Sequence, residues 1–173
     1  MKRLAFLFAA VVLFMPACDD DPASPSNLPL RFTADLRAAN EVPPVTGTES
    51  NASGTMTLTV DVTRDGAGAI TAVNSSTFVV NLFGFPANTA ITAAHIHPGA
   101  AGVNGSPAVN LNLAAGEVTI GANGSASFTK SPQVPITVEQ AQNLANTPQN
   151  FYFNVHTPTN TGGAARGQLA RTQ

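Results

Sequence analysis

The sequence predicts an all-β protein, a Greek-key-like β-sandwich or barrel with one short helix. Short segments in which apolar and polar residues alternate recur along the chain, and clusters of Gly, Asn and Pro separate them. Only 10% of the 173 residues are charged, and the Leu-, Glu- and Lys-rich patterns that build helices are scarce. The length fits one domain plus accessory segments.

The clearest strand pattern lies in the first half of the chain. Every second residue is apolar in residues 30–36 and again in residues 54–62, as expected for strands with one buried face. The segment Arg64-Asp65-Gly66-Ala67-Gly68 is rich in residues that tolerate tight turns. We therefore expect it to join the second strand to a returning strand over 69–73 and 77–82.

The second half of the chain predicts more short strands and the helix. We expect residues 117–120 to pair with residues 125–130 across a Gly/Asn turn. Thr137 and Gln140 have the spacing of a capping box, so a helix is predicted over 137–145. The other expected strands are 91–97, 109–113, 151–155 and 166–169.

The N-terminus indicates export. Two basic residues precede an apolar run from Leu4 to Phe14, so residues 1–17 are predicted to be a signal peptide of the lipoprotein type. Cys18, the only cysteine, follows directly and resembles the lipidated first residue of a bacterial lipoprotein. Residues 18–29 are polar and Pro/Ser-rich and are expected to form a disordered tether to a domain over 30–173. The expected location is the cell envelope, periplasmic or outer surface, with a lipid on Cys18 in the membrane; secretion with an unmodified thiol is the alternative.

Charge and motifs exclude several functions. Removing residues 1–17 takes two of the 8 basic residues and leaves 6 against 10 acidic ones, a net charge of −4. Such a domain has no basic surface for nucleic acid. The sequence has neither the nucleophile-elbow pattern of a serine hydrolase nor a phosphate-binding glycine motif. A binding or interaction protein is therefore favoured over an enzyme.

The three histidines form the one candidate site. His95 and His97 lie two apart in an expected strand, so their side chains project from one face, and His156 ends another strand-like run. Neutral imidazoles bind copper and zinc, and three of them leave a coordination position open. The alternative is structural: the rings hydrogen-bond to Asn154, Thr157 or the backbone and hold the glycine-rich loop that follows His97.

Four motifs follow one another along the chain: Asn40-Glu41-Val42-Pro43-Pro44-Val45, Ala94-His95-Ile96-His97 with the glycines that follow, Tyr152 with Asn154-Val155-His156-Thr157, and Gly162-Gly163-Ala164-Ala165-Arg166-Gly167-Gln168. Together they resemble the CHRD domain family, named after chordin, from about Phe32 to Leu169. Chordin is an extracellular antagonist of growth factors, so the resemblance implies a binding module with an extracellular or periplasmic protein partner.

The same histidines also resemble part of Cu/Zn superoxide dismutase. His95-Ile96-His97 looks like that enzyme's His-Val-His segment, and His156 with the following glycine turn and Arg166 looks like its later copper histidine and anion-guiding arginine. The resemblance implies copper ligands at the three histidines and an alternative function as a copper-dependent redox protein. Departures are the missing fourth histidine and zinc-ligand loop, and Cys18, which has no partner for the family's disulfide.

Two charged residues near these motifs have open roles. Glu41, beside Pro43-Pro44, is either a partner that orients a histidine or a carboxylate that caps backbone amides. Arg166 either binds an anion or pairs with Glu41 or with loop carbonyls.

Overall fold

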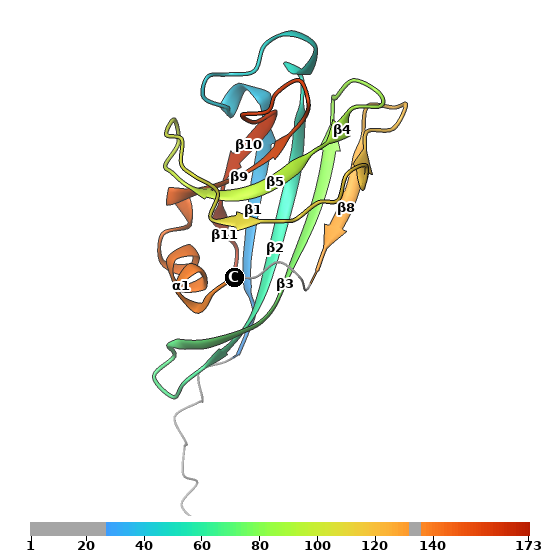
Figure 1. Ribbon diagram of the computed structural model, residues 1–173. Coiled ribbons are helices and arrows are strands. Elements are labelled where there is room, and N and C mark those ends of the chain that lie inside the picture. The colour runs from blue at the N-terminus through green and yellow to red at the C-terminus, as the bar shows by residue number, and fades with distance from the viewer. Residues whose placement is uncertain (1–26, 132–135) are drawn as a thin grey trace, which may run out of the picture.

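The computed structural model describes residues 27–131 and 136–173, and these form a curled antiparallel β-sheet with one short α-helix (Figure 1). The all-β class is therefore confirmed. The expected signal peptide, Cys18 and most of the tether lie outside the described residues. The strands are β1 (Leu30–Arg37), β2 (Ser53–Arg64), β3 (Ile70–Phe83), β4 (Ala90–Ile91), β5 (Ala93–Pro98), β6 (Val109–Asn110), β7 (Val118–Thr119), β8 (Ala126–Lys130), β9 (Phe151–His156), β10 (Ala165–Gln168) and β11 (Ala170–Arg171). The helix is α1 (Val138–Asn146), and the 3-10 turns are η1 (Ala38–Asn40), η2 (Gly47–Glu49) and η3 (Pro148–Asn150).

The main sheet curls until distant strands pack on each other. Its strand order is β6-β5-β9-β10-β1-β2-β3-β8, with β11 beside β1. Three strands separate β9 from β3 in this order, yet the rings of Phe153 and Phe78 stack with centroids 6.3 Å apart. The sheet therefore forms a half-barrel around one core, with β5 crossing in front of β1 and β2 (Figure 1).

The alternation in the sequence explains which strand faces line the core. Leu30, Phe32, Met56, Leu58 and Val60 have no exposed surface, while the residues between them are exposed or half-buried. Burial of these apolar side chains is the main driving force for the curl. The returning strand β3 is continuous; the pairing steps from Asp61↔Ser75 to Val62↔Val73, so Asn74 is an extra residue in a β-bulge.

The predicted pairing of residues 117–120 with 125–130 is wrong. β8 instead forms a five-residue ladder with β3, in which Phe128 lies opposite Val80. β7 pairs with β4 in a separate two-stranded sheet. The turn between β7 and β8 is present, with the Gly121 N–H donating to the Ser125 carbonyl. β8 nevertheless pairs with β3, because β3 offers five residues for pairing and β7 has only two.

The predicted helix is confirmed as α1. Thr137 accepts a hydrogen bond from the backbone N–H of Gln140, and the Gln140 side chain accepts one from the N–H of Thr137. The helix lies against β3, where Gln142 donates to the carbonyl of Ile70 at 3.1 Å. None of the helices in the described part of the chain is long and apolar enough to cross a membrane.

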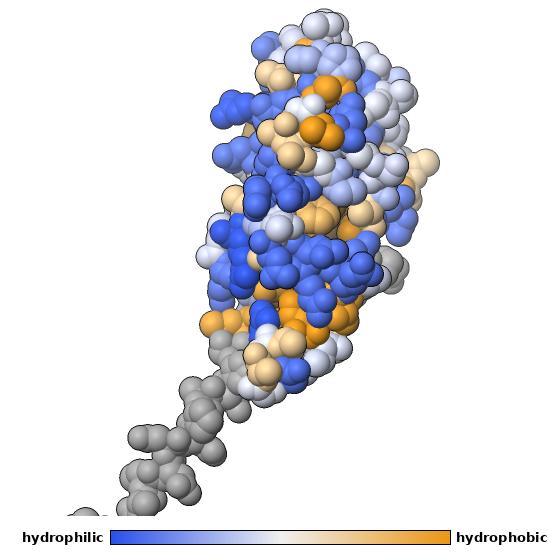
Figure 2. Space-filling view, turned by 90° about the vertical axis from the view of Figure 1, so that its left-hand side faces the viewer, coloured by the Kyte–Doolittle hydropathy of each residue, from blue (hydrophilic) through white to orange (hydrophobic). Residues whose placement is uncertain are grey.

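Figure 2 shows the surface on the side of α1 and the site loops. It is mostly hydrophilic, and apolar atoms occur in small groups between polar ones. The large apolar side chains that are most exposed in the described residues lie at scattered positions: Leu28, Val79, Phe83 and Val103.

Candidate metal centre

The strand register brings the three histidines together on the face of the sheet that points away from the core. β5 and β9 are antiparallel, with Ala93 opposite His156, His95 opposite Asn154, and His97 opposite Tyr152. The residues that alternate with them, Ile96 and Phe153 among others, point into the core. One nitrogen from each ring can be chosen so that all three lie within 4.8 Å of one another.

Two loops cover the histidine cluster. His97 and His156 are only 5% and 8% exposed, while His95 is half-buried. Nδ1 of His97 lies 2.8 Å from the carbonyl oxygen of Gly105, in the loop 99–105. Nδ1 of His156 lies 2.9 Å from the carbonyl oxygen of Thr161, in the loop 157–163. Each loop therefore contributes one backbone acceptor to one ring.

These two contacts determine which ring nitrogen carries the proton. A carbonyl oxygen can only accept, so Nδ1 of His97 and Nδ1 of His156 are the protonated nitrogens. In a neutral ring the lone pair then sits on Nε2, which is the atom available to a metal. Metal-bound histidines usually donate their other N–H in this way, to a carbonyl or a carboxylate.

Burial keeps the three rings neutral. Desolvation and the nearby rings of His156 and His97 lower the pKa of His95 from 6.5 to about 4. Desolvation also lowers the pKa of His97, against the opposing effects of the Gly105 carbonyl and the Asn154 side chain, and it lowers the pKa of His156 against that of the Thr161 carbonyl. Neutral imidazoles at physiological pH are the form that binds metals.

The lone pairs have few protein partners. Nε2 of His97 is buried and has no hydrogen-bond partner in residues 27–131 and 136–173. Nε2 of His156 lies 3.0 Å from Nδ1 of His95 and 3.0 Å from Oδ1 of Asn154. Buried polar atoms are rarely left without partners, so the His97 nitrogen calls for an explanation.

Arg166 fixes the loop that holds His97. Its guanidinium donates to the carbonyl of Val103 and to Oδ1 of Asn104, both at 2.9 Å. It also lies over the ring of Tyr152, 3.7 Å from the centroid, and the other neighbour of that ring is His97, stacked at 4.7 Å. Because β9 lies between β5 and β10, His97 and Arg166 sandwich Tyr152. Of the roles predicted for Arg166, the contact with loop carbonyls is the one that the structure shows.

Gly105 is required where this loop returns to β5. A side chain at this position would collide with the carbonyl group of Pro98. The close approach lets the Gly105 carbonyl reach His97, while its N–H donates to the hydroxyl of Tyr152 at 3.3 Å. Only glycine permits a backbone contact this close.

Glu49 fixes the loop that holds His156. Its carboxylate is 1% exposed and accepts hydrogen bonds from the Thr157 hydroxyl at 2.8 Å and from the Asn160 side chain at 2.6 Å. Sequence reasoning missed Glu49 because no local pattern connects it to residues more than a hundred positions away. It also missed Tyr152 as a site residue, although Tyr152 shares the parity of Asn154 and His156 in β9 and could have been found that way.

Glu41 lies beside Asn154 in an unusual environment. It is 6% exposed, and its Oε1 is the second buried side-chain atom in the described residues that has no hydrogen-bond partner. Desolvation raises its pKa from 4.5 to about 7, against the opposing effects of the Arg166 charge and a hydrogen bond from Asn154. Among the described residues the one ion pair joins Lys130 to Glu117, so Glu41 and Arg166 act on each other only through longer-range charge.

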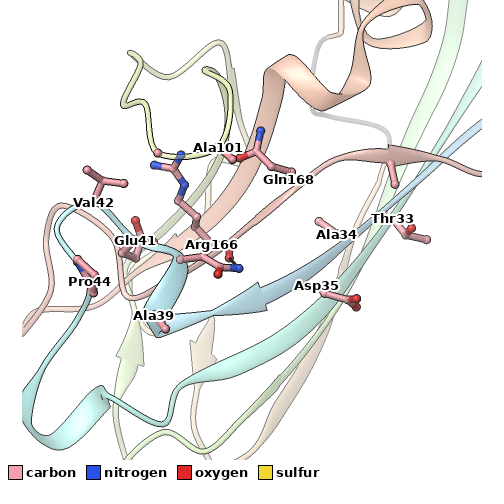
Figure 3. Close-up of a pocket in the computed structure, with 13 residues that line it drawn as sticks. Thr33, Ala34, Asp35, Ala39, Glu41, Val42, Pro44, Ala101, Arg166 and Gln168 are labelled. Carbon is pink, nitrogen blue, oxygen red and sulfur yellow. Dashed lines mark hydrogen bonds between the residues drawn. The ribbon is translucent and has the colours of Figure 1, made fainter.

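A cavity of about 630 Å³ lies next to this network. Figure 3 shows Arg166 of β10 between the loop carrying Ala101 and the loop carrying Glu41, with Gln168 of β10 and Asp35 of β1 on the side away from Glu41. Arg166 and Glu41 therefore line this cavity and also belong to the network around the histidines.

The family follows from a comparison with known families. The model of the CHRD domain matches residues 32–169, most of the chain. The protein belongs to the CHRD domain family. No curated protein and no solved structure matches it. Membership suggests an extracellular binding module, and the histidines, Glu41, Asn154 and Arg166 all lie within the matched residues.

Proposed function

We propose that this CHRD-domain protein is an extracytoplasmic binding module that holds one transition-metal ion, copper or zinc, through His95, His97 and His156. The observation that carries the proposal is Nε2 of His97, which is buried and has no hydrogen-bond partner in the described residues. A metal ion among the three rings gives this lone pair a partner.

The chemistry of the ligand atoms also supports copper or zinc. Three neutral imidazole nitrogens suit copper and zinc, whereas calcium and magnesium require oxygen ligands. Two of the rings are held by backbone carbonyls at their far nitrogens, so their lone pairs are oriented before a metal arrives. Preorganisation of this kind reduces the entropy lost on binding.

The position of the site agrees with an anchor at the N-terminus. The signal-like residues 1–17 and Cys18 are the basis for proposing export and lipidation. β1 begins at Leu30 at the lower end of the domain (Figure 1), and the site lies beyond its other end, where Arg37 pairs with Arg166. Eight residues of strand span about 26 Å. A tether before Leu30 would therefore leave the domain at the end away from the site.

The experiment uses the protein with its own N-terminus and without a histidine tag. We expect elemental analysis of protein purified from the envelope to find one copper or zinc per chain, and calorimetric titration of metal-free protein to reproduce that ratio. His97→Asn is the decisive variant, since the Asn amide can still donate to Gly105 but has no equivalent of Nε2. It should fold normally and lose metal binding.

Three results would overturn parts of the proposal. Wild-type protein that takes up neither metal would leave the histidines with the structural role alone. Metal-free protein that captures a protein partner from outside the cytoplasm would instead make the domain an interaction module. An unmodified Cys18 in the mass spectrum of the mature protein would exclude the lipid anchor.

A copper-dependent redox protein is the second candidate function. It is favoured by His95, which is less buried as a residue than His97 and His156 and is therefore the part of the site nearest to solvent. The measurement that distinguishes it is superoxide turnover by copper-loaded protein. A binding module should show no turnover above that of free copper, and a redox protein should show turnover that His97→Asn abolishes.

A further inference from the structure

The amide oxygen of Asn154 points into the histidine cluster. Asn154 is 1% exposed and lies on β9 directly opposite His95 of β5 and Arg166 of β10. Its Oδ1 lies 3.0 Å from Nε2 of His156. That nitrogen carries a lone pair, because Nδ1 of His156 donates to Thr161. Two acceptors therefore face each other at hydrogen-bond distance, an arrangement that a cation between them would stabilise.

Glu41 explains why the amide has this orientation. Asn154 stabilises the ionised form of the Glu41 carboxyl group. Only a donor does this, so the NH₂ of the amide faces Glu41 while its oxygen faces His156. Rotating the amide by half a turn would put its oxygen against a carboxylate. The carboxyl group of Glu41 is itself held against Gly163, where a Cβ atom would lie 2.6 Å from the carboxyl carbon.

We propose that Oδ1 of Asn154 is the fourth ligand of the metal, and that Glu41 is the positioning residue that aims it. The proposal rests on the function proposed above and completes its ligand set. The set is then Nδ1 of His95, Nε2 of His97, Nε2 of His156 and Oδ1 of Asn154. In the metal-free protein Nδ1 of His95 donates to Nε2 of His156, so His95 must change to the tautomer protonated at Nε2 when the ion binds.

The geometry is close to that of a tetrahedral site. Metal–ligand bonds of 2.0–2.1 Å place neighbouring ligand atoms about 3.3 Å apart. His156 Nε2 is 3.0 Å from both His95 Nδ1 and Asn154 Oδ1, and the three histidine nitrogens lie within 4.8 Å. Small side-chain shifts are therefore enough to close the site around an ion.

The charge of the Glu41 carboxylate suggests a second role, which is to balance the charge of the bound ion. All four ligands are neutral, so a divalent ion would carry its full charge into a buried position, which is unfavourable. The carboxyl group of Glu41 is buried beside Asn154, and its Oε1 has no partner within residues 27–131 and 136–173. An ionised Glu41 would supply the counter-charge without entering the coordination sphere. Three nitrogens and one oxygen, with no sulfur, favour Cu²⁺ or Zn²⁺ over Cu⁺.

The test uses Cu²⁺ and Zn²⁺ titrations and the electron paramagnetic resonance spectrum of the copper form. Asn154→Leu removes the oxygen at similar volume and should weaken binding about 10- to 100-fold, as should Glu41→Gln. Asn154→Asp keeps an oxygen ligand and should retain binding with a shifted copper spectrum. Glu139→Gln, an exposed acid on α1, is the matched control and should leave both affinity and spectrum unchanged.

The outcomes separate this inference from the function on which it rests. Wild-type protein that binds no metal overturns both. Wild-type protein that binds metal, with Asn154→Leu and Asn154→Asp unchanged in affinity and in spectrum, overturns the fourth ligand and leaves the three-histidine site in place. If Asn154→Leu fails to fold, the copper spectrum of Asn154→Asp decides, because replacing a directly bound amide oxygen by a carboxylate oxygen changes the copper hyperfine coupling much more than a new charge outside the coordination sphere does.

Discussion

Replacing Glu41 with glutamine should stabilise the metal-free protein, and increasingly so as the pH rises. Burial raises the pKa of Glu41 from 4.5 to about 7. Between these values the folded protein binds the proton more tightly than the unfolded chain does. Raising the pH through this window therefore destabilises the wild-type fold, and Glu41→Gln, which does not titrate, escapes that loss.

The size of the effect follows from the same pKa shift. A pKa unit corresponds to 1.36 kcal/mol, so a rise from 4.5 to about 7 amounts to about 3 kcal/mol in the free energy of unfolding. Below pH 4.5 Glu41 is protonated in both the folded and the unfolded wild-type protein, so the difference in stability between the two proteins should be constant there. Above pH 7 the advantage of Glu41→Gln should be fully developed.

Urea unfolding of both proteins from pH 4 to 8, with chelator present, measures this difference. The histidines also titrate in this range, but they do so in both proteins and cancel when one stability curve is subtracted from the other. Glu139→Gln, the same substitution at an exposed position on α1, is the control for this measurement. A difference between Glu41→Gln and wild type that stays constant from pH 4 to 8 would show that Glu41 is ionised at little cost in the fold, and the reasoning would be refuted.

Three further predictions concern the same site. Gly163→Ala should lower the free energy of unfolding by about 1–3 kcal/mol, measured by thermal or urea unfolding. The reason is that Gly163 has φ +141° and a Cβ atom there would collide with the Glu41 carboxyl group. Gly162→Ala is the control and should have little effect, because the space around Gly162 is open. Arg166→Gln should release the loop 99–105 and weaken metal binding about 10- to 100-fold in calorimetric titration; unchanged affinity would mean that the loop holds its position without the guanidinium. In the Glu41→Gln background, where Glu41 no longer titrates, zinc affinity should change little between pH 7.5 and 5.5, because desolvation lowers the pKa of His95 to about 4 and also lowers the pKa of His97 and of His156; a tenfold or larger loss of affinity would indicate a histidine with an ordinary pKa near 6.5.

Local patterns were enough to predict several elements. The alternation in β2 places Met56, Leu58 and Val60 in the core, as expected from its period of two. The capping box at Thr137 marks the start of α1. The two-residue spacing of His95 and His97 predicts that they share a face, and the register of β5 with β9 adds His156 to that face. In each case a short-range rule determines the outcome.

Features that depend on long-range packing could not be read from the sequence. The partner of β8 is β3, more than forty residues earlier, because the curl of the sheet leaves that edge open. Glu49 and Thr157 are 108 positions apart and meet only after folding. Arg166 had three plausible partners in the sequence, and only the path of the loop 99–105 decides among them.

The distribution of unsatisfied groups argues that this face of the sheet is maintained for more than folding. One face of β5 and β9 carries Ile96 and Phe153 into the core, where burial stabilises the fold. On the opposite side lie the two buried side-chain atoms in the described residues that lack a partner, Nε2 of His97 on β5 and Oε1 of Glu41 after η1, and each such atom costs about 1–3 kcal/mol. An apolar residue at either position would remove that cost. Loops that are fixed by Arg166 and Glu49 keep both atoms beside Asn154 instead, which is the arrangement expected if an ion or another ligand completes the site.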